Sequence, residues 1–277
     1  MIANKQMLAT RRVLSGGAIL VALGMIESAA AQETSTPAGP ERAIHASVET
    51  RDFGADHGTL NSATVEYKIE DGGSTIVANA IAGEFRGRFE TERAVGAGVT
   101  LYQRFDGGIS TRTRIAVAES EPVFARLDLA QDITFGLARA TTMTFGARWA
   151  DYAEGGDVHS LSAGLRYYFA GGSVGYRASY VDPEDRASLV AHLVNLSLND
   201  ATGAGRTQLW FSAGSTSLET PLSDDFAGED YGVFLRRVQP LTDTLNVTGS
   251  FGVASYDRPA GRATGTTFGL GIEVDLE

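Results

Sequence analysis

The amino-acid sequence predicts an all-β protein, a transmembrane antiparallel up-and-down β-barrel of about fourteen strands. Three observations lead to this prediction. Apolar and polar residues alternate with a period of two along most of the chain after residue 43. Short turn sequences separate the alternating segments, and 33 of the 277 residues are glycine. After residue 31 no apolar run has the length of a membrane-spanning helix, so only strands could cross a membrane.

The first 43 residues are expected to lie outside the barrel. Residues 1–31 have the parts of a cleavable signal peptide: a positive segment, an apolar core and a small-residue cleavage site. These parts are Lys5, Arg11 and Arg12, residues 13–26, and Ala29, Ala30 and Ala31. We interpret the arginine pair as ordinary signal-peptide charge and not as a twin-arginine signal, because a barrel should be exported unfolded. Residues 32–43 are predicted to be a disordered periplasmic tail, and 44–277 the outer-membrane barrel.

Alternation and turn residues define fourteen strand candidates, or twelve if weak candidates around 87–93 merge. They lie near 44–53, 62–70, 74–86, 93–105, 108–118, 122–132, 139–152, 157–169, 172–181, 187–199, 206–217, 227–239, 243–256 and 264–276. The clearest hairpin joins 158–169 to 173–180, because the glycine pair between them permits the positive φ of a tight turn.

The links between strands should sort into two sets. From a periplasmic N-terminus, single-chain barrels place tight turns in the periplasm and longer loops outside the cell. The predicted periplasmic links are 71–73, 106–107, 136–138, 170–172, 199–205 and 240–242. The predicted outer loops are 54–61, 87–92, 119–121, 153–156, 182–186, 218–226 and 257–263.

One face of each strand should contact lipid and the other the lumen. The predicted lipid-facing residues include Val65, Tyr67, Ile69, Val95, Ala97, Val99, Leu101, Met143, Phe145, Trp149, Phe268, Leu270, Ile272, Val274 and Leu276. A cationic side chain on the lipid face at the midplane costs about 2–4 kcal/mol, so mid-strand arginines should face the lumen. The predicted lumen-lining residues are Arg104, Arg112, Arg114, Arg126, Arg148, Arg166, Arg177, Arg236, Glu66, Lys68, Asp128 and Glu273.

An arginine-rich lumen supports two interpretations, and both stay open. It could be a pore biased toward anions or acidic glycans. It could instead be a closed lumen in which arginines pair with acidic side chains, which is favoured because small barrels fill their interiors. A soluble periplasmic β-protein is a third class, disfavoured by the number of strands and by aromatic residues near strand ends.

Composition excludes several function classes. The chain has 23 Lys and Arg against 34 Asp and Glu; signal cleavage would remove three of the first and one of the second, leaving a net charge of −13. This balance argues against nucleic-acid binding. Without cysteine and with four histidines, no disulfide, metal site or cofactor is expected. Acidic runs at 182–185 and 224–230 could hold Ca²⁺, but without EF-hand spacing solvated turns are the preferred interpretation.

Catalysis is not predicted, since a nucleophile needs a base within hydrogen-bond reach and an orienting third group. The candidate groups are His159 with Ser160 or Ser162, and His192 with Asn195 or Ser197. Serines alternate between faces in any strand, and a histidine near a membrane interface needs no catalytic explanation.

Small motifs in the central hairpins carry a family resemblance. Residues 146–152 (GARWADY), 157–169 (DVHSLSAGLRYYF) and 173–177 (SVGYR) resemble the central hairpins of YaiO-family outer-membrane β-barrels, and the spacing is similar from Ile44 to Leu276. The resemblance implies a barrel in the Gram-negative outer membrane and a role connected with surface or exported polysaccharide, but no functional residue. The chain departs from typical barrels in ending Asp275-Leu276-Glu277 without a terminal aromatic residue.

The leading functional hypothesis is therefore a narrow pore, or an accessory in envelope polysaccharide export or solute passage. A structural or adhesive surface barrel with a plugged lumen is the alternative. The expected partners are outer-membrane lipid and lipopolysaccharide, the barrel assembly machinery and polysaccharide export components.

Overall fold

The computed structural model describes residues 41–276 except 55–57, 88–90, 120–123, 153–155, 185–186, 202–204, 215–230 and 257–261. The described residues form fourteen strands, which close into one antiparallel barrel. None of the described residues belongs to a helix long and apolar enough to cross a membrane. The strands are β1 (Glu41–Asp52), β2 (Thr59–Asp71), β3 (Ser74–Arg86), β4 (Thr91–Phe105), β5 (Ile109–Ala118), β6 (Leu127–Ala138), β7 (Thr141–Asp151), β8 (Asp157–Phe169), β9 (Gly172–Pro183), β10 (Leu189–Asn199), β11 (Arg206–Ala213), β12 (Tyr231–Pro240), β13 (Leu245–Tyr256) and β14 (Ala263–Leu276).

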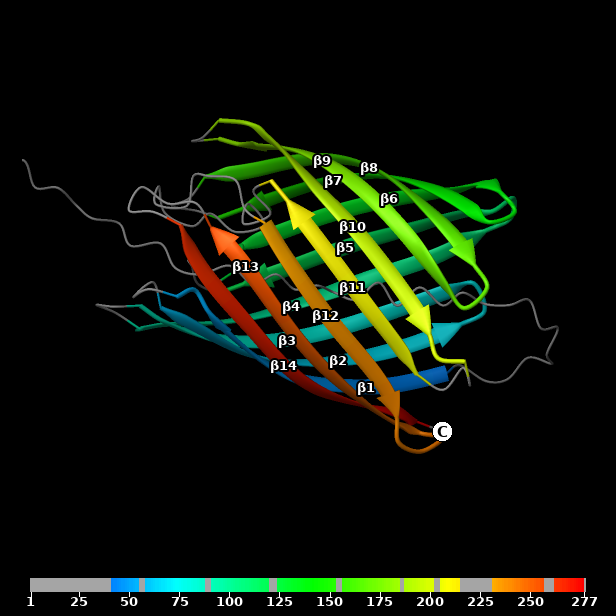
Figure 1. Ribbon diagram of the computed structural model, residues 1–277, viewed down its shortest axis with the longest axis horizontal. Helices are drawn as coiled ribbons and strands as arrows, with labels where there is room; N and C mark the ends of the chain where they lie inside the picture. Colours follow the sequence, from blue (N-terminus) through cyan, green and yellow to red (C-terminus); the bar gives the residue numbers. More distant parts are fainter. Residues whose placement is uncertain are drawn as a thin grey trace, which may run out of the picture.

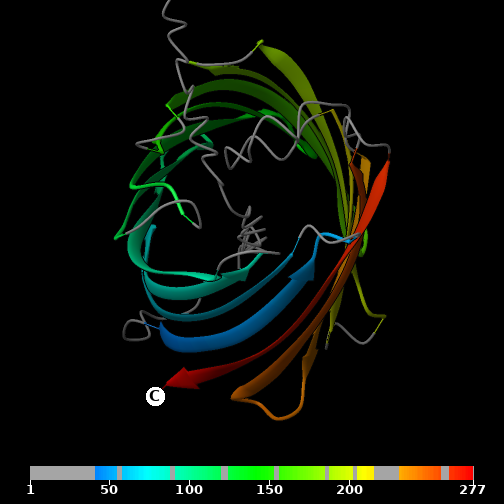
Figure 2. The same ribbon diagram turned by 90° about the vertical axis from the view of Figure 1, so that its left-hand side faces the viewer.

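Every strand pairs with its neighbours in the sequence, and the last strand pairs with the first. In that closing pair Ile44 lies opposite Val274 and Thr50 opposite Phe268. Figure 2 shows the result end-on, with the red β14 beside the blue β1. Closure leaves no sheet edge, so each strand can satisfy its backbone hydrogen bonds on both sides without water.

The links divide between the two ends of the barrel. Figure 1 shows tight turns at one end together with the C-terminus; we call it the turn end. It carries the links 72–73, 106–108, 139–140, 170–171, 200–205 and 241–244. Gly171, with a φ of 86°, makes the tight turn of the β8–β9 hairpin. The other end, the loop end, carries the links 53–58, 87–90, 119–126, 152–156, 184–188, 214–230 and 257–262.

All fourteen predicted strands are present, but some of their bounds differ from the prediction. β1 begins at Glu41, three residues before the predicted start, and β11 ends at Ala213. β6 was predicted at 122–132 and lies at Leu127–Ala138. The predicted link at 136–138 is therefore wrong. Those residues complete β6 with an irregular register between Gly136 and Ala138, where an extra residue disturbs the alternation on which the prediction rested.

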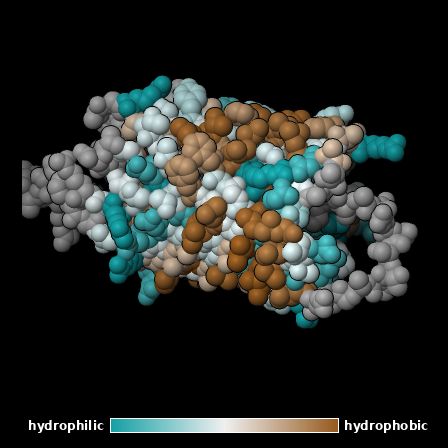
Figure 3. All heavy atoms as spheres, turned by 60° about the horizontal axis from the view of Figure 1, so that its bottom comes forward, coloured by the Kyte–Doolittle hydropathy of each residue, from teal (hydrophilic) through white to brown (hydrophobic). Residues whose placement is uncertain are grey.

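The outer face of the barrel is apolar, as predicted. Exposed fractions reach 50% at Leu165, 53% at Val65 and 66% at Leu270, and Figure 3 shows hydrophobic side chains over much of the visible wall. Gln131 is a polar exception on this face, and it accepts a hydrogen bond of 2.6 Å from Thr113. A large exposed apolar wall is what a lipid-facing barrel requires.

The face assignment makes a testable prediction at two adjacent residues of β8. Leu165→Arg should block membrane assembly, because it adds about 2–4 kcal/mol if the arginine sits near the midplane of the lipid face. Arg166→Ala should assemble normally, since Arg166 is on the other face, with its Nε 3.5 Å from where a Cβ on inward-facing Gly175 would lie. The measurement is the membrane-inserted fraction, scored by heat-modifiable migration on gels. Leu165→Ala controls for lost apolar area, and equal tolerance of Leu165→Arg and Arg166→Ala would contradict the alternation.

Candidate functional site

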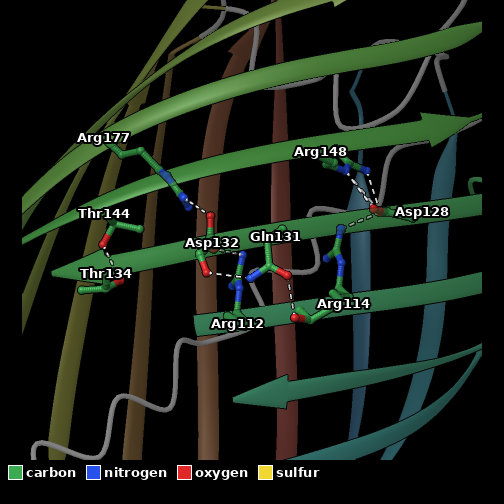
Figure 4. Close-up of polar contacts among 10 residues, drawn as sticks. Arg112, Arg114, Asp128, Gln131, Asp132, Thr134, Thr144, Arg148 and Arg177 are labelled. Atoms are coloured by element: carbon green, nitrogen blue, oxygen red, sulfur yellow. Dashed lines mark hydrogen bonds and ion pairs between the residues drawn. The ribbon is translucent and has the colours of Figure 1, made fainter. Parts of the chain in front are cut away.

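Two aspartates of β6 each bind two arginines on the inner wall of the barrel (Figure 4). Asp128 Oδ2 lies 2.5 Å from Arg114 Nη2 on β5 and 2.8 Å from Arg148 Nη2 on β7. Asp132 Oδ2 lies 2.7 Å from Arg112 Nη2 on β5, and its other oxygen pairs with Arg177 of β9. We call these six residues the arginine–aspartate network. It joins β5, β6, β7 and β9 into one charged inner surface.

The contact between Arg177 and Asp132 shows that the network lies inside the barrel. β7 and β8 separate the two strands concerned, so the guanidinium must cross both on the lumen side. It crosses above Gly146 of β7. A Cβ there would lie 2.1 Å from Asp132 Oδ1 and 2.7 Å from Arg177 Nη2. Gly146 is therefore the residue that leaves room for the ion pair.

The network carries more positive than negative charge. It contains four arginines and two aspartates, and their side chains are mostly shielded, with exposed fractions between 11% and 21%. Charges taken out of bulk water are costly unless partners compensate them. Within these six residues, the two aspartates balance two of the four guanidinium charges.

Glu66 of β2 and Glu273 of β14 are acidic side chains on another part of the wall, next to His45 of β1. Glu66 Oε2 lies 3.2 Å from His45 Nδ1, and Glu273 Oε1 accepts a hydrogen bond of 3.3 Å from Asn246. Both glutamates interact electrostatically with Arg236 of β12. We call His45, Glu66 and Glu273 the glutamate side.

Tyr102 of β4 connects the two regions. Arg112 donates a hydrogen bond to its hydroxyl group, and Glu66 lies within electrostatic range of the same side chain. The lumen thus carries an excess of arginine on β5 to β9, while the wall at β1 and β2 holds Glu66 together with the ion pairs Arg51–Glu49 and Lys68–Glu70. Such an arrangement produces an electrostatic field perpendicular to the barrel axis as well as one parallel to it.

The remaining predicted lumen-lining residues lie at different depths. Lys68 pairs with Glu70 on β2 at 2.9 Å. Arg104 is near the turn end, half exposed, with its Nη2 3.9 Å from Glu70. Arg126 was expected within a strand, but it precedes β6 at the loop end. There its Nε donates a hydrogen bond of 3.0 Å to Asp151 Oδ2. Its backbone N–H bonds to the Asp151 carbonyl there, which sets it at the rim and not in mid-strand.

Two apolar clusters line the inside of the barrel near the loop end. One contains Phe53, Leu60 and Ala94, with Phe85 packed edge-on to Phe53 at 6.2 Å. The other contains Ala150, Tyr152, Val158 and Val181. The polar middle of the lumen is therefore bordered on the loop side by two apolar wall segments.

The catalytic pairs considered from the sequence do not form. His159 is exposed on the outer face of β8, whereas Ser160 and Ser162 alternate to the inner face. His192 is on the outer face of β10 and bonds to Tyr176 Oη at 2.8 Å, while Asn195 and Ser197 are buried on the inner face. The barrel wall separates each base from its proposed partner. Among the described residues, no group of three His, Asp or Glu side chains could hold a metal ion.

Asp182 and Glu184, from the first acidic run, make local bonds at the loop end. Asp182 accepts from Ser188 Oγ, and Glu184 accepts from the backbone N–H of Asp157. Asp185 and residues 224–230 lie outside the described residues.

An ion pair at the turn end joins Asp200, the residue after β10, to β12. Asp200 Oδ1 in the link 200–205 accepts a hydrogen bond of 2.7 Å from Arg237 Nη1 of β12. This hydrogen bond lowers the pKa of Asp200 below its usual value. Asp200 is therefore held against β12.

Some residues of the inner wall were missed by the sequence analysis. Asp132 follows Asp128 at the same alternation and could have been assigned to the lumen from that signal. Gly146 could not, because the need for a glycine depends on Arg177 reaching across two strands. Trp210 and Phe234 also face inward, in phase with Arg206 and Arg236.

Comparison with known proteins agrees with this architecture. The family model described as the YaiO membrane beta barrel domain matches residues 41–218. Among solved structures, the chain is similar to one described as a bacterial polysaccharide outer membrane secretin, with a TM-score of 0.50, 9% identity and coverage of 88% of this chain and 100% of that one. It is also similar to the anion-selective porin from Comamonas acidovorans (TM-score 0.45, 9% identity, 86% and 99% covered) and to the KdgM porin (0.44, 10%, 85% and 99%). At these identities the likeness concerns the fold alone.

The position of Gly146 generates a prediction about stability. Gly146→Ala should lower the free energy of unfolding by about 1–3 kcal/mol, because the added methyl group overlaps the Asp132–Arg177 ion pair. Gly249→Ala is the matched control and should be tolerated, since a Cβ there has no atom within 4 Å. The measurement is urea unfolding of the protein refolded in lipid vesicles.

A double substitution tests the cause of that loss. In an Asp132→Ala background the methyl group at position 146 has no carboxylate to displace, so most of the cost should disappear. An equal cost in both backgrounds would show that the cost comes from the other two near contacts, Arg177 Nη2 and Ser162 Oγ, each 2.7 Å from the added Cβ, and not from the carboxylate of Asp132.

Proposed function

Because this chain belongs to the YaiO membrane β-barrel family, we propose that it is a narrow, anion-preferring pore. It would lie in the outer membrane of a Gram-negative bacterium, reached by export and removal of residues 1–31. The observation that carries the proposal is the ratio of four arginines to two aspartates in the arginine–aspartate network.

The physical basis is the balance between dehydration and attraction. A solute entering a narrow lumen loses part of its water shell, and fixed guanidinium groups replace that water for an anion but not for a cation. Arginine suits this role because its planar group stays charged and can donate two parallel hydrogen bonds to a carboxylate or phosphate. The glutamate side limits how strongly an anion is held, which favours passage over trapping.

The cellular role we propose is passage of acidic solutes or assistance in exporting acidic envelope polysaccharide. No catalytic step is part of it. Lipopolysaccharide would surround the barrel, the barrel assembly machinery would insert it, and polysaccharide export components are candidate partners.

A closed structural or adhesive barrel is the second candidate. Two observations favour it: the aspartates of the network are fully engaged by arginines, and apolar clusters border the lumen near the loop end. The two candidates differ in one measurable property, ion conductance.

Opposite substitutions in the arginine–aspartate network should shift ion selectivity in opposite directions. Arg112→Gln with Arg114→Gln leaves one arginine for each aspartate, and we expect the anion-to-cation permeability ratio to fall several-fold. The measurement is the reversal potential of single channels in planar bilayers under a KCl gradient. Arg93→Gln is the matched control, because Arg93 is 78% exposed outside the lumen.

Asp128→Asn with Asp132→Asn should raise the same permeability ratio, since it removes both negative charges and keeps all four arginines. A ratio that moves the same way in both double variants would contradict the assignment of selectivity to this network. A folded, heat-modifiable barrel without conductance would refute the pore and support the closed barrel.

A further inference from the structure

The inner wall on β11 and β12 carries an aromatic pair that the charge arrangement does not explain. The rings of Trp210 and Phe234 are 5.4 Å apart and meet at 62°. Their sequence neighbours Phe211 and Leu235 are exposed on the outer face, so alternation turns this pair toward the lumen. Neither ring is fully buried. Aromatic rings on a lumen wall present flat apolar surface to whatever enters.

A glycine on β13 and the register of β11 with β12 set the position of this aromatic pair. Gly252 of β13 lies under Phe234, and a Cβ at that position would come within 2.8 Å of the Phe234 ring. Trp210 and Phe234 are also direct register partners across β11 and β12. The Phe234 ring therefore packs against β13 at Gly252 and against the Trp210 ring of β11.

Two polar groups without hydrogen-bond partners lie on the residues next to the rings. Gln208 and Arg236 are the next inward-facing register pair on the same strands. Gln208 is 5% exposed, and its Oε1 has no hydrogen-bond partner among the described residues. The same holds for Nε of Arg236. Two residues paired in register thus carry an acceptor and a donor that lack the hydrogen bonds buried polar groups normally make.

Arg236 has charged neighbours of both signs: Arg206 of β11 is near enough to repel it, and Glu66 and Glu273 attract it. Its Nε nevertheless has no hydrogen-bond partner among the described residues. A ligand for this part of the wall would combine an anionic acceptor for Arg236, a hydroxyl donor for Gln208 and a flat apolar face for the Trp210 indole. A bare carboxylate lacks the apolar face, and an aromatic acid lacks the donor.

We propose that Gln208, Trp210, Phe234 and Arg236 form a binding subsite for one unit of an acidic saccharide. The C–H face of a pyranose ring would pack on the indole of Trp210. Its carboxylate would bind Arg236, and a ring hydroxyl would donate to Gln208 Oε1. This subsite rests on the proposed function, because the saccharide must enter the lumen, and it narrows the solute from anions to uronic-acid oligomers.

Tryptophan fluorescence can test the subsite directly. The chain has two tryptophans, and Trp149 is on the outer face, so Trp149→Phe leaves Trp210 as the single reporter. We titrate this variant, purified in detergent, with trigalacturonate and expect a saturable change in emission. Neutral maltotriose and acetate should bind about ten-fold more weakly or not at all, since each supplies only part of the recognition.

Two further variants assign the effect to residues. Adding Arg236→Gln should weaken trigalacturonate binding by about ten-fold or more, whereas adding Arg93→Gln on the exterior should not change it. Trp210→Phe with Trp149 retained should abolish the signal.

The outcomes separate this inference from the proposed function. No saturable change in a preparation that conducts ions would overturn the subsite and leave the pore standing. Equal binding of maltotriose or of acetate would overturn the acidic-saccharide assignment. Binding of trigalacturonate without conductance would support the subsite and refute the pore.

Discussion

The structure depends on one constraint: inside a lipid bilayer every backbone N–H and C=O must find a partner within the protein. Fourteen antiparallel strands meet it only because β14 pairs with β1 and leaves no edge. Because the barrel is closed, alternate residues of each strand face lipid on the outside and the lumen on the inside. Val65, Leu165 and Leu270 face outward, and their neighbours face the lumen. The alternating sequence is the direct consequence of that division.

The same constraint concentrates the charges inside, where they must be organised. Arginines excluded from the lipid face share the aspartates of β6, and Arg177 reaches Asp132 across two strands because Gly146 has no side chain. Pairing lowers the cost of confined charge without removing the positive excess. Acidic groups were not distributed evenly to cancel it; Glu66 and Glu273 lie on the other part of the wall. Because of that separation, the electrostatic potential differs between the two parts of the lumen wall.

Charge and aromatic surface occupy neighbouring parts of this wall. Under the proposed function, the arginine–aspartate network would give the preference for anions, and Trp210, Phe234, Gln208 and Arg236 would bind a larger polar molecule with an apolar face. His159 and His192 contribute to neither, since both are exposed on the outer face. Both proposals therefore place the function of this barrel on the wall of the lumen, and they treat solute passage and ligand binding as two properties that can be measured separately.

The barrel and most face assignments could be predicted from the sequence, because the alternation of apolar and polar residues is a local property of each strand. The sequence left the strand number at fourteen or twelve, and the structure has fourteen. The sequence placed Arg112, Arg114, Asp128 and Arg148 on one face because of the same alternation. The bounds of β6 were misjudged, since its irregular register near Gly136 breaks that period. Only the tertiary structure decided which arginine meets which aspartate, that Gly146 must be glycine, and that Arg236 faces Glu66 and Glu273. Those contacts join distant strands, and their geometry follows from the curvature and register of the closed barrel.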